Sequence, residues 1–192
     1  FESYKQTQDT PVYTQADDPS GLSTADRTTE RKTVRLSYQF EDIDSNLFNL
    51  NTIFYHTEIA LNEKRIIDKR KDKITLVTDG LNIQNQSSWK LAEADNLLTY
   101  GLEWYQDEQT SSRDGESLRT YPNATVQVIG IFLQDELIWQ KKWELILGLR
   151  YDRFVTKAKE FDSSRSQDQL SPKFTTSYQF KPWLRSYISY SK

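Results

Sequence analysis

The stretch from Gly130 to Phe154, GIFLQDELIWQKKWELILGLRYDRF, constrains the fold more than any other part of the chain. Along its second half, apolar side chains alternate with mostly polar or small ones, which is the period-two pattern of a β-strand with two different faces. The apolar positions are Trp143, Leu145, Leu147, Leu149 and Tyr151, and the intervening ones are Glu144, Ile146, Gly148, Arg150 and Asp152. The pattern predicts a hairpin with one apolar face.

The turn of this hairpin indicates what the apolar face contacts. Trp139 and Trp143 stand on either side of Gln140, Lys141 and Lys142. Indole rings favour the boundary between a membrane and water, and lysine side chains there extend towards the water. We therefore predict that the apolar face is in contact with lipid.

Composition limits how the chain could cross a membrane. Only 36% of the 192 residues are hydrophobic and 28% are charged, and no apolar run approaches the roughly 20 residues of a spanning helix. A β-barrel needs lipid-facing side chains at alternate positions only, so its mean hydropathy is low. Any membrane role of this chain is therefore predicted to be that of a β-barrel.

Charge and residue usage exclude several other classes. The net charge of −3, from 25 basic and 28 acidic residues, gives no basic surface for nucleic acid. Without cysteine, the chain has no disulfide and no thiolate metal site. Methionine is absent as well, including at position 1, and no signal-like segment opens the chain, so we expect a piece of a longer protein.

We expect one domain over residues 1–192, with a polar loop region at 1–28 and a meander of β-hairpins over 29–192. About eight strands are predicted from the alternation, and the third is expected to break at Asp79 and Gly80. The predicted strands cover residues 33–40, 47–61, 74–89, 98–105, 130–139, 143–154, 174–180 and 184–190.

The connections between these strands alternate in length. Short turns are predicted near 41–46, 91–96, 140–142 and 181–182, and long polar loops at 62–73, 107–123 and 157–169. Outer-membrane barrels have short turns at one rim and long loops at the other. Aromatic residues gather near the predicted short turns, as in an interfacial girdle: Phe40, Phe48, Trp89, Trp139, Trp143, Phe180 and Trp183. The three long loops are the candidate ligand-binding region, although the pattern singles out no individual residue.

Apolar and polar residues also alternate in a soluble antiparallel sheet. The side chains of the second face therefore decide between a soluble sheet and a membrane barrel. That face carries charged and amide side chains, which suit a wet lumen better than a packed core. They are Arg35, Gln39, Asn49, Asn51, Glu103, Glu144, Arg150 and Asp152. The fold class predicted is all-β, an antiparallel up-and-down transmembrane β-barrel segment.

Several segments carry a resemblance to a known family. TYPNATVQVIGIFLQDELIW, LILGLRYDRF and SPKFTTSYQFKPWLRSYISYSK resemble the barrel domain of TonB-dependent outer-membrane receptors. The matching motifs are Gly130, Phe132, Gln134, Asp135 and Glu136, followed by Gly148, Leu149, Arg150, Tyr151 and Asp152. DRTTERKTVRLSYQFED, LTYGLEWYQDE and the SRDG segment look like the branch that takes up haem or haemoprotein. The resemblance runs from about residue 25 to the end of the chain.

The resemblance implies a barrel of roughly 22 strands in the outer membrane of a Gram-negative type of cell. It also implies a plug domain inside the barrel, the inner-membrane partner TonB, and haem or a ferric complex as the transported ligand, with a haem carrier protein possible at the loops. No part of this chain matches the plug. We therefore expect a slice of the larger barrel, with no cofactor of its own.

Candidate catalytic and metal-binding residues have simpler interpretations. His56, the only histidine, continues the lipid-facing series and is expected at the interface rather than on a metal. Arg150 and Asp152 are expected to form an ion pair in the barrel wall or to contact the plug. Asp135 and Glu136 are adjacent, so they point to opposite faces and cannot act as a catalytic pair.

The remaining motifs do not indicate an enzyme. The SSRDGES segment, residues 111–117, has hydroxyls and carboxylates but no histidine base. Asn123, Ala124 and Thr125 match a glycosylation sequon, which is common by chance. Three other functions stay open: a siderophore or cobalamin receptor of the same superfamily, a passive barrel or porin, and a soluble ligand-binding β-domain.

Overall fold

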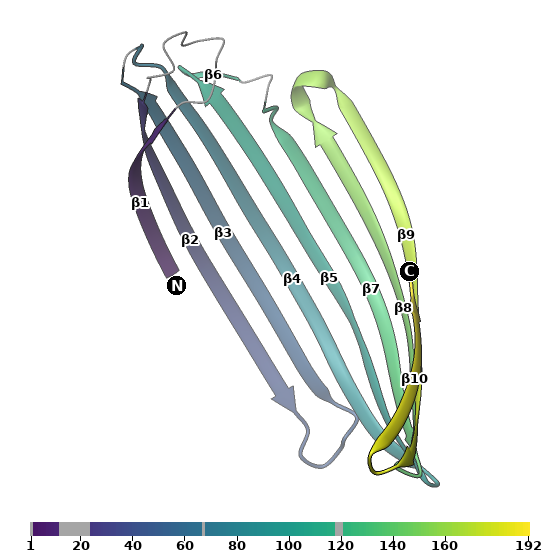
Figure 1. Cartoon of the computed structure of the whole chain (residues 1–192). Helices are drawn as coiled ribbons and strands as arrows, with labels where there is room; N and C mark the ends of the chain where they lie inside the picture. Colours follow the sequence, from purple (N-terminus) through teal and green to yellow (C-terminus); the bar gives the residue numbers. More distant parts are fainter. Residues whose placement is uncertain (1, 12–23, 67, 118–120) are drawn as a thin grey trace.

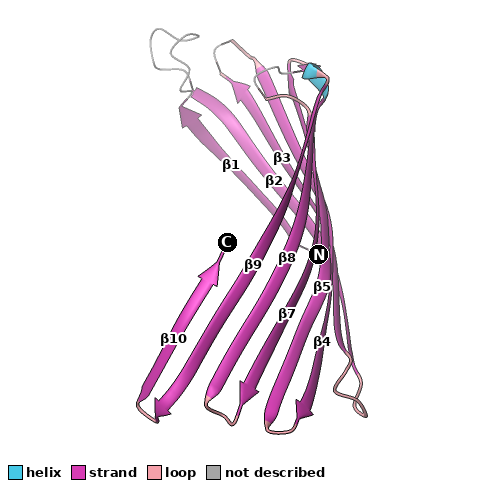
Figure 2. Cartoon of the chain, turned by 90° about the vertical axis from the view of Figure 1, so that its right-hand side faces the viewer, coloured by secondary structure: helices cyan, strands magenta, loops and turns pink. Residues whose placement is uncertain are grey.

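In a computed structural model, the described residues (2–11, 24–66, 68–117 and 121–192) form one antiparallel sheet. The sheet has ten strands. Adjacent strands follow the order of the chain, β1-β2-β3-β4-β5-β7-β8-β9-β10, and the short β6 pairs with β5. Figure 1 shows the strands side by side and strongly tilted, and Figure 2 shows the sheet curved into a trough whose edges are β1 and β10. The predicted all-β meander is confirmed.

The strands are long, and most of them run from one rim of the sheet to the other (Figure 1). Their bounds are β1 Glu2–Pro11, β2 Thr24–Glu41, β3 Asn49–Arg65, β4 Lys71–Leu91, β5 Ala94–Arg113, β6 Glu116–Ser117, β7 Ala124–Trp139, β8 Trp143–Ala158, β9 Ser163–Lys181 and β10 Leu184–Ser191. One 3₁₀ turn, Lys159–Phe161, follows β8. Among the described residues, no helix has the length and apolar character needed to cross a membrane.

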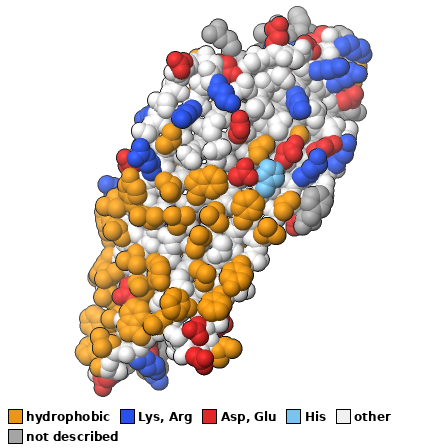
Figure 3. Space-filling view, turned by 180° about the vertical axis from the view of Figure 1, so that it is seen from behind, with side chains coloured by type: hydrophobic (Ala, Val, Ile, Leu, Met, Phe, Trp, Pro, Cys, Tyr) orange, Lys and Arg blue, Asp and Glu red, His pale blue; other side chains and the backbone are white. Residues whose placement is uncertain are grey.

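The register places the predicted apolar positions in rows across the sheet. One row joins Leu36, Phe54, Leu81, Trp104 and Ile129 by direct cross-strand pairing. Because paired residues of an antiparallel sheet share a face, these rows define one apolar side, which we call the outer face. It is the convex side seen in Figure 3, where the orange side chains cover the lower part of the sheet.

The apolar rows form a belt rather than a core. Leu133, Leu147 and Leu149 are each about half exposed, at 50%, 46% and 48%. Of the described hydrophobic residues, only Ala25, Ala94 and Val128 are buried. A single layer of sheet leaves this surface without a protein partner, and an apolar patch of this extent requires one or a lipid environment.

The height of the belt fits a membrane. From Ile129 at its upper edge to Trp139 at its lower edge are ten residues, about 33 Å along a strand. With the strand tilt of about 40° found in outer-membrane barrels, this corresponds to about 25 Å along the membrane normal, the height of their apolar band.

One rim, which we call the turn end, carries the predicted aromatic girdle. It consists of the connections 42–48, 92–93, 140–142 and 182–183. Trp139 and Trp143 pair across the hairpin there, and the Trp143 ring lies 5.0 Å from that of Tyr178. All seven girdle residues are exposed; Trp183, at 76%, is the most exposed of them.

The opposite rim, the loop end, has shorter connections than predicted. It consists of 66–70, 114–123 and 159–162, so much of the predicted loops 62–73, 107–123 and 157–169 is strand. Beyond the belt the outer face is mostly polar, whereas the inner face carries apolar pairs such as Ile59 with Leu76 and Leu61 with Ile74. The alternation of the belt therefore ends there while backbone pairing continues. Arg27 and Glu63 illustrate this, since they pair across β2 and β3 and form an ion pair.

Two further expectations differ from the structure. The predicted loop region 1–28 contains β1, and β2 begins at Thr24; residues 12–23 lie outside the described part of the chain. The predicted break at Asp79 and Gly80 is absent, because β4 continues through it. Gly80 instead makes room for the ring of Tyr55, which a Cβ at position 80 would approach to 2.1 Å.

Gly101 on β5 is a position where the wall tolerates no side chain. A Cβ there would lie 2.3 Å from the Ile83 carbonyl oxygen and 2.7 Å from the Phe132 ring. Since the first contact is with backbone, the strands must shift, and we expect Gly101→Ala to destabilise the sheet by about 1–3 kcal/mol. Urea unfolding of the purified full-length protein in detergent measures this. Gly148→Ala is the matched control, because the atom nearest its Cβ position is a side-chain carbon of Lys173 at 3.3 Å and no backbone atom lies close; an equal or larger loss in the control would contradict the packing argument.

Candidate functional site

The three predicted loops come together at the loop end, where hydrogen bonds join their connections. Two hydrogen bonds link Lys71 and Asp114: Asp114 N donates to Lys71 O at 2.8 Å, and Lys71 N donates to the Asp114 side-chain carboxylate at 2.9 Å. Lys159 N donates to Asn123 O at 2.9 Å. The candidate binding region is therefore one continuous surface.

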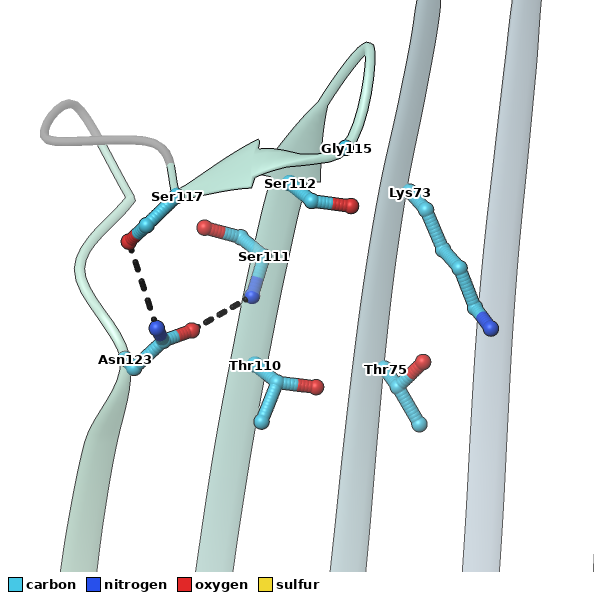
Figure 4. Close-up of a pocket in the computed structure, with 8 residues that line it drawn as sticks. All are labelled: Lys73, Thr75, Thr110, Ser111, Ser112, Gly115, Ser117 and Asn123. Carbon is cyan, nitrogen blue, oxygen red and sulfur yellow. Dashed lines mark hydrogen bonds between the residues drawn. The ribbon is translucent and has the colours of Figure 1, made fainter.

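A polar pocket of about 330 Å³ opens in this surface. Figure 4 shows its lining: Lys73, Thr75, Thr110, Ser111, Ser112, Gly115, Ser117 and Asn123. Asp114 and Gly115 both have positive φ, at 50° and 92°, as the central residues of tight hairpins do. This turn brings β6 back beside β5, so that Ser117 pairs with Ser112.

Asn123 fixes the wall of the pocket next to β7. Its Oδ1 accepts a hydrogen bond from Ser111 N at 2.8 Å, and its Nδ2 donates to Ser117 Oγ at 3.2 Å (Figure 4). Ser117 Oγ in turn donates to Glu160 at 2.5 Å. This hydrogen bond lowers the pKa of the Glu160 carboxyl below its usual value. The Ser117 hydroxyl thus ties the β5–β7 connection to the β8–β9 connection.

The inner face carries the ion pair predicted for Arg150 and Asp152. The Arg150 guanidinium lies 2.8 Å from Asp152 and 2.6 Å from Glu103, and Asn82 Nδ2 donates to Glu103 at 2.9 Å. Asp152 is only 8% exposed. Gly130 leaves room for this cluster, since a Cβ there would lie 2.6 Å from both Arg150 and Asp152. The cluster cross-links β4, β5 and β8 on the inner face.

His56 lies on the outer face, as predicted. Its row continues through Asp79, Gln106 and Gln127, directly above the row of Leu36 and Ile129. His56 Nδ1 lies 2.7 Å from Asp79 Oδ1, and the histidine in Figure 3 marks the upper edge of the apolar belt. No group of three or more potential metal ligands occurs within the described ranges.

Asp135 and Glu136 point to opposite faces, as expected for neighbours in a strand. Asp135 pairs with Leu98 and Leu147 on the outer face, and Glu136 pairs with Leu97 and Ile146 on the inner face. Asn123 has a structural role at the pocket, where its side chain joins Ser111 and Ser117. Sequence reasoning did not identify the pocket; the Asp-Gly pair at 114–115 was the signal that could have located its hairpin.

Comparison with known proteins identifies the family. The model of the TonB-dependent receptor-like β-barrel family matches residues 1–192, so the chain belongs to this family. The sequence relatives include a hemin receptor of Yersinia pestis, 25% identical over 185 residues, which are 95% of this chain and 27% of the relative. Another is the heme/hemopexin utilization protein C of Haemophilus influenzae, 23% identical over 155 residues, or 78% of this chain and 21% of the relative.

Solved structures share the fold. The hemophore receptor HasR of Serratia marcescens, solved with its hemophore HasA and heme, has a TM-score of 0.75 at 18% identity and covers 98% of this chain. The alcaligin receptor FauA of Bordetella pertussis has a TM-score of 0.74 at 16% identity and also covers 98%. This chain spans 32% and 31% of those two chains, and about a quarter of the sequence relatives (27% and 21%).

Proposed function

We propose that this chain forms part of the barrel wall of an outer-membrane TonB-dependent receptor that takes up haem or haemoprotein. The observation that carries the proposal is the two-faced wall: an apolar belt of membrane height on the outer face, and an ionic and amide surface on the inner face. Within a family of receptors, this arrangement suits a barrel that holds lipid outside and a wet passage inside.

Sequence relatives favour haem as the transported ligand. The hemin receptor of Yersinia pestis aligns along 95% of this chain. The fold alone does not separate haem from siderophore, because HasR and the alcaligin receptor FauA have nearly the same TM-score, 0.75 and 0.74. A siderophore receptor is therefore the second candidate.

The proposal includes three partners. The inner face, with the Arg150 cluster, would contact a plug domain of the same protein, and TonB would supply the energy for transport. A haem carrier protein would bind at the loop end; the related structure of HasR is a complex with its hemophore HasA. In this proposal the chain needs no cofactor of its own, since haem is the cargo.

Growth on a single iron source tests the proposal. The full-length receptor is expressed in an iron-starved Gram-negative strain that lacks other haem receptors, and haemin, a panel of ferric siderophores or haemoglobin is supplied. We expect growth on haemin that disappears when TonB is deleted.

The other outcomes would assign a different function. Growth on a ferric siderophore but not on haemin would make the protein a siderophore receptor, and cobalamin uptake is assayed in the same strains. Haemin-dependent growth that survives loss of TonB would contradict active transport and favour a passive barrel.

A further inference from the structure

The polar pocket at the loop end opens on the outer face, away from the lumen. Ser112 pairs with both Lys73 on β4 and Ser117 on β6, and Thr75 pairs with Thr110. These residues lie on the same side of the sheet as Leu81 and Trp104, because an even number of residues separates them along each strand. A ligand in this pocket would therefore sit outside the barrel.

The pocket also stands above the apolar belt. On β4, six residues separate Thr75 from Leu81 at the upper edge of the belt, which is about 20 Å along the strand. At the tilt of outer-membrane barrels this is about 15 Å above the hydrocarbon. At that height the barrel wall faces the head groups of the outer leaflet rather than their acyl chains.

The lining suits a ligand rich in hydroxyl groups. Thr75, Thr110 and Ser112 present hydroxyls that have no hydrogen-bond partner among the residues that the structure describes, and Lys73 adds one exposed ammonium group. A hydroxyl both donates and accepts, whereas the ammonium group only donates. The volume of about 330 Å³ lies at the lower end of the range for small-molecule sites.

The lining carries too little charge for a purely ionic ligand. Lys73 is its only charged side chain, and the Glu160 carboxylate lies just behind Ser117. A multiply charged phosphate would meet one cation here, whereas anion sites use several cations or a bidentate arginine. The Asn123 side chain, whose two hydrogen bonds are already made, holds the pocket open without a ligand.

We propose that this pocket binds a saccharide on the outer wall of the barrel, at a site separate from the route of the transported ligand. The bound saccharide is the sugar head group of a glycolipid in the surrounding outer leaflet, because the pocket faces that layer. The inference rests on the proposed outer-membrane location but not on haem as the cargo.

The test uses the full-length receptor, purified in detergent from outer membranes, and two probes: lipopolysaccharide, and the lipid-free oligosaccharide released from it by mild acid. In the variant Thr75→Val/Thr110→Val, two hydroxyls are replaced by methyl groups of the same shape. We expect the amount of lipopolysaccharide bound per receptor to fall about tenfold, in keeping with two lost hydrogen bonds. Thr125→Val is the matched control, because Thr125 is on the same face but outside the pocket, and it should bind as the wild type does.

Each outcome is decisive. Reduced binding of lipopolysaccharide alone would assign the site to the membrane glycolipid, and reduced binding of both probes would support a saccharide site open to soluble glycans as well. Equal binding by wild type and double variant, or no binding by the wild type, would overturn the inference. Neither probe contains haem, and the growth test on haemin uses the wild-type receptor, so failure of the saccharide site and failure of the proposed function are distinguishable.

Discussion

Replacing Phe174 by arginine is expected to lower the free energy of unfolding of the membrane-inserted receptor by about 2–4 kcal/mol. Phe174 lies in the middle of the apolar belt on β9, where it pairs with Leu147 and Tyr190. Both direct partners are uncharged, and Leu147 separates position 174 from Asp135 in the same row, so the guanidinium would face the hydrocarbon without a carboxylate directly beside it. The receptor is folded into lipid vesicles and unfolded with guanidinium chloride, and intrinsic tryptophan fluorescence reports the transition.

The matched control for this prediction lies on the same strand and the same face. Ser166 pairs with Val155 in the row of His56 and Gln127, above the belt. Arginine there should cost only about 0–1 kcal/mol, the value found near the interface of such barrels. Similar losses for Phe174→Arg and Ser166→Arg would mean that the outer face is not immersed in lipid.

The second large effect is expected on the inner face, for Arg150→Met. Methionine keeps an unbranched apolar stem but leaves the carboxylates of Asp152 and Glu103 without their cation. Breaking a buried pair costs about 3–5 kcal/mol; because the Arg150 side chain is 36% exposed, we expect about 2–3 kcal/mol. The same vesicle unfolding experiment measures it.

A variant in which the Arg150 cluster carries no charge distinguishes the loss of ion pairing from the loss of side-chain packing. In the triple variant Arg150→Met/Asp152→Asn/Glu103→Gln, no charge is left unpaired, and most of the lost stability should return. If the triple variant were no more stable than Arg150→Met alone, the ion pairs would not be what joins β4, β5 and β8 here.

The faces of the strands could be predicted because lipid on one side and water on the other produce alternation within the belt. All eight predicted strands are present, and both the Trp143 and the Leu98 series point outwards as expected. The prediction succeeded where the two faces differ in chemistry, for example between Leu149 and Arg150.

Above the belt the same reasoning failed for a physical reason. Pairs such as Glu63 with Asp72 and Glu108 with Thr125 continue the ladder, but the outer face there is mostly polar, so the pattern of apolar outer residues that marks a strand ends. The strands therefore extended into the predicted loops. Backbone hydrogen bonds, which the sequence does not display, fix their ends.

The candidate site was predictable only as a region. The loops at 62–73, 107–123 and 157–169 were correctly grouped at one rim, yet the pocket depends on side chains that meet through the fold. The Ser117–Glu160 hydrogen bond joins residues 43 apart in the chain. Neither partner has an unusual sequence context, so only the structure could connect them.

The most direct test of the central claim is the accessibility of single spin labels along β8 in the full receptor, reconstituted in lipid. The chain contributes no cysteine of its own, so labels are introduced one at a time at positions 145 to 150. We predict high collision rates with oxygen, which concentrates in lipid, at Leu145, Leu147 and Leu149, and low rates at Ile146, Gly148 and Arg150. Uniform rates along the strand, or maxima at the second set, would contradict a wall with lipid on its outer face.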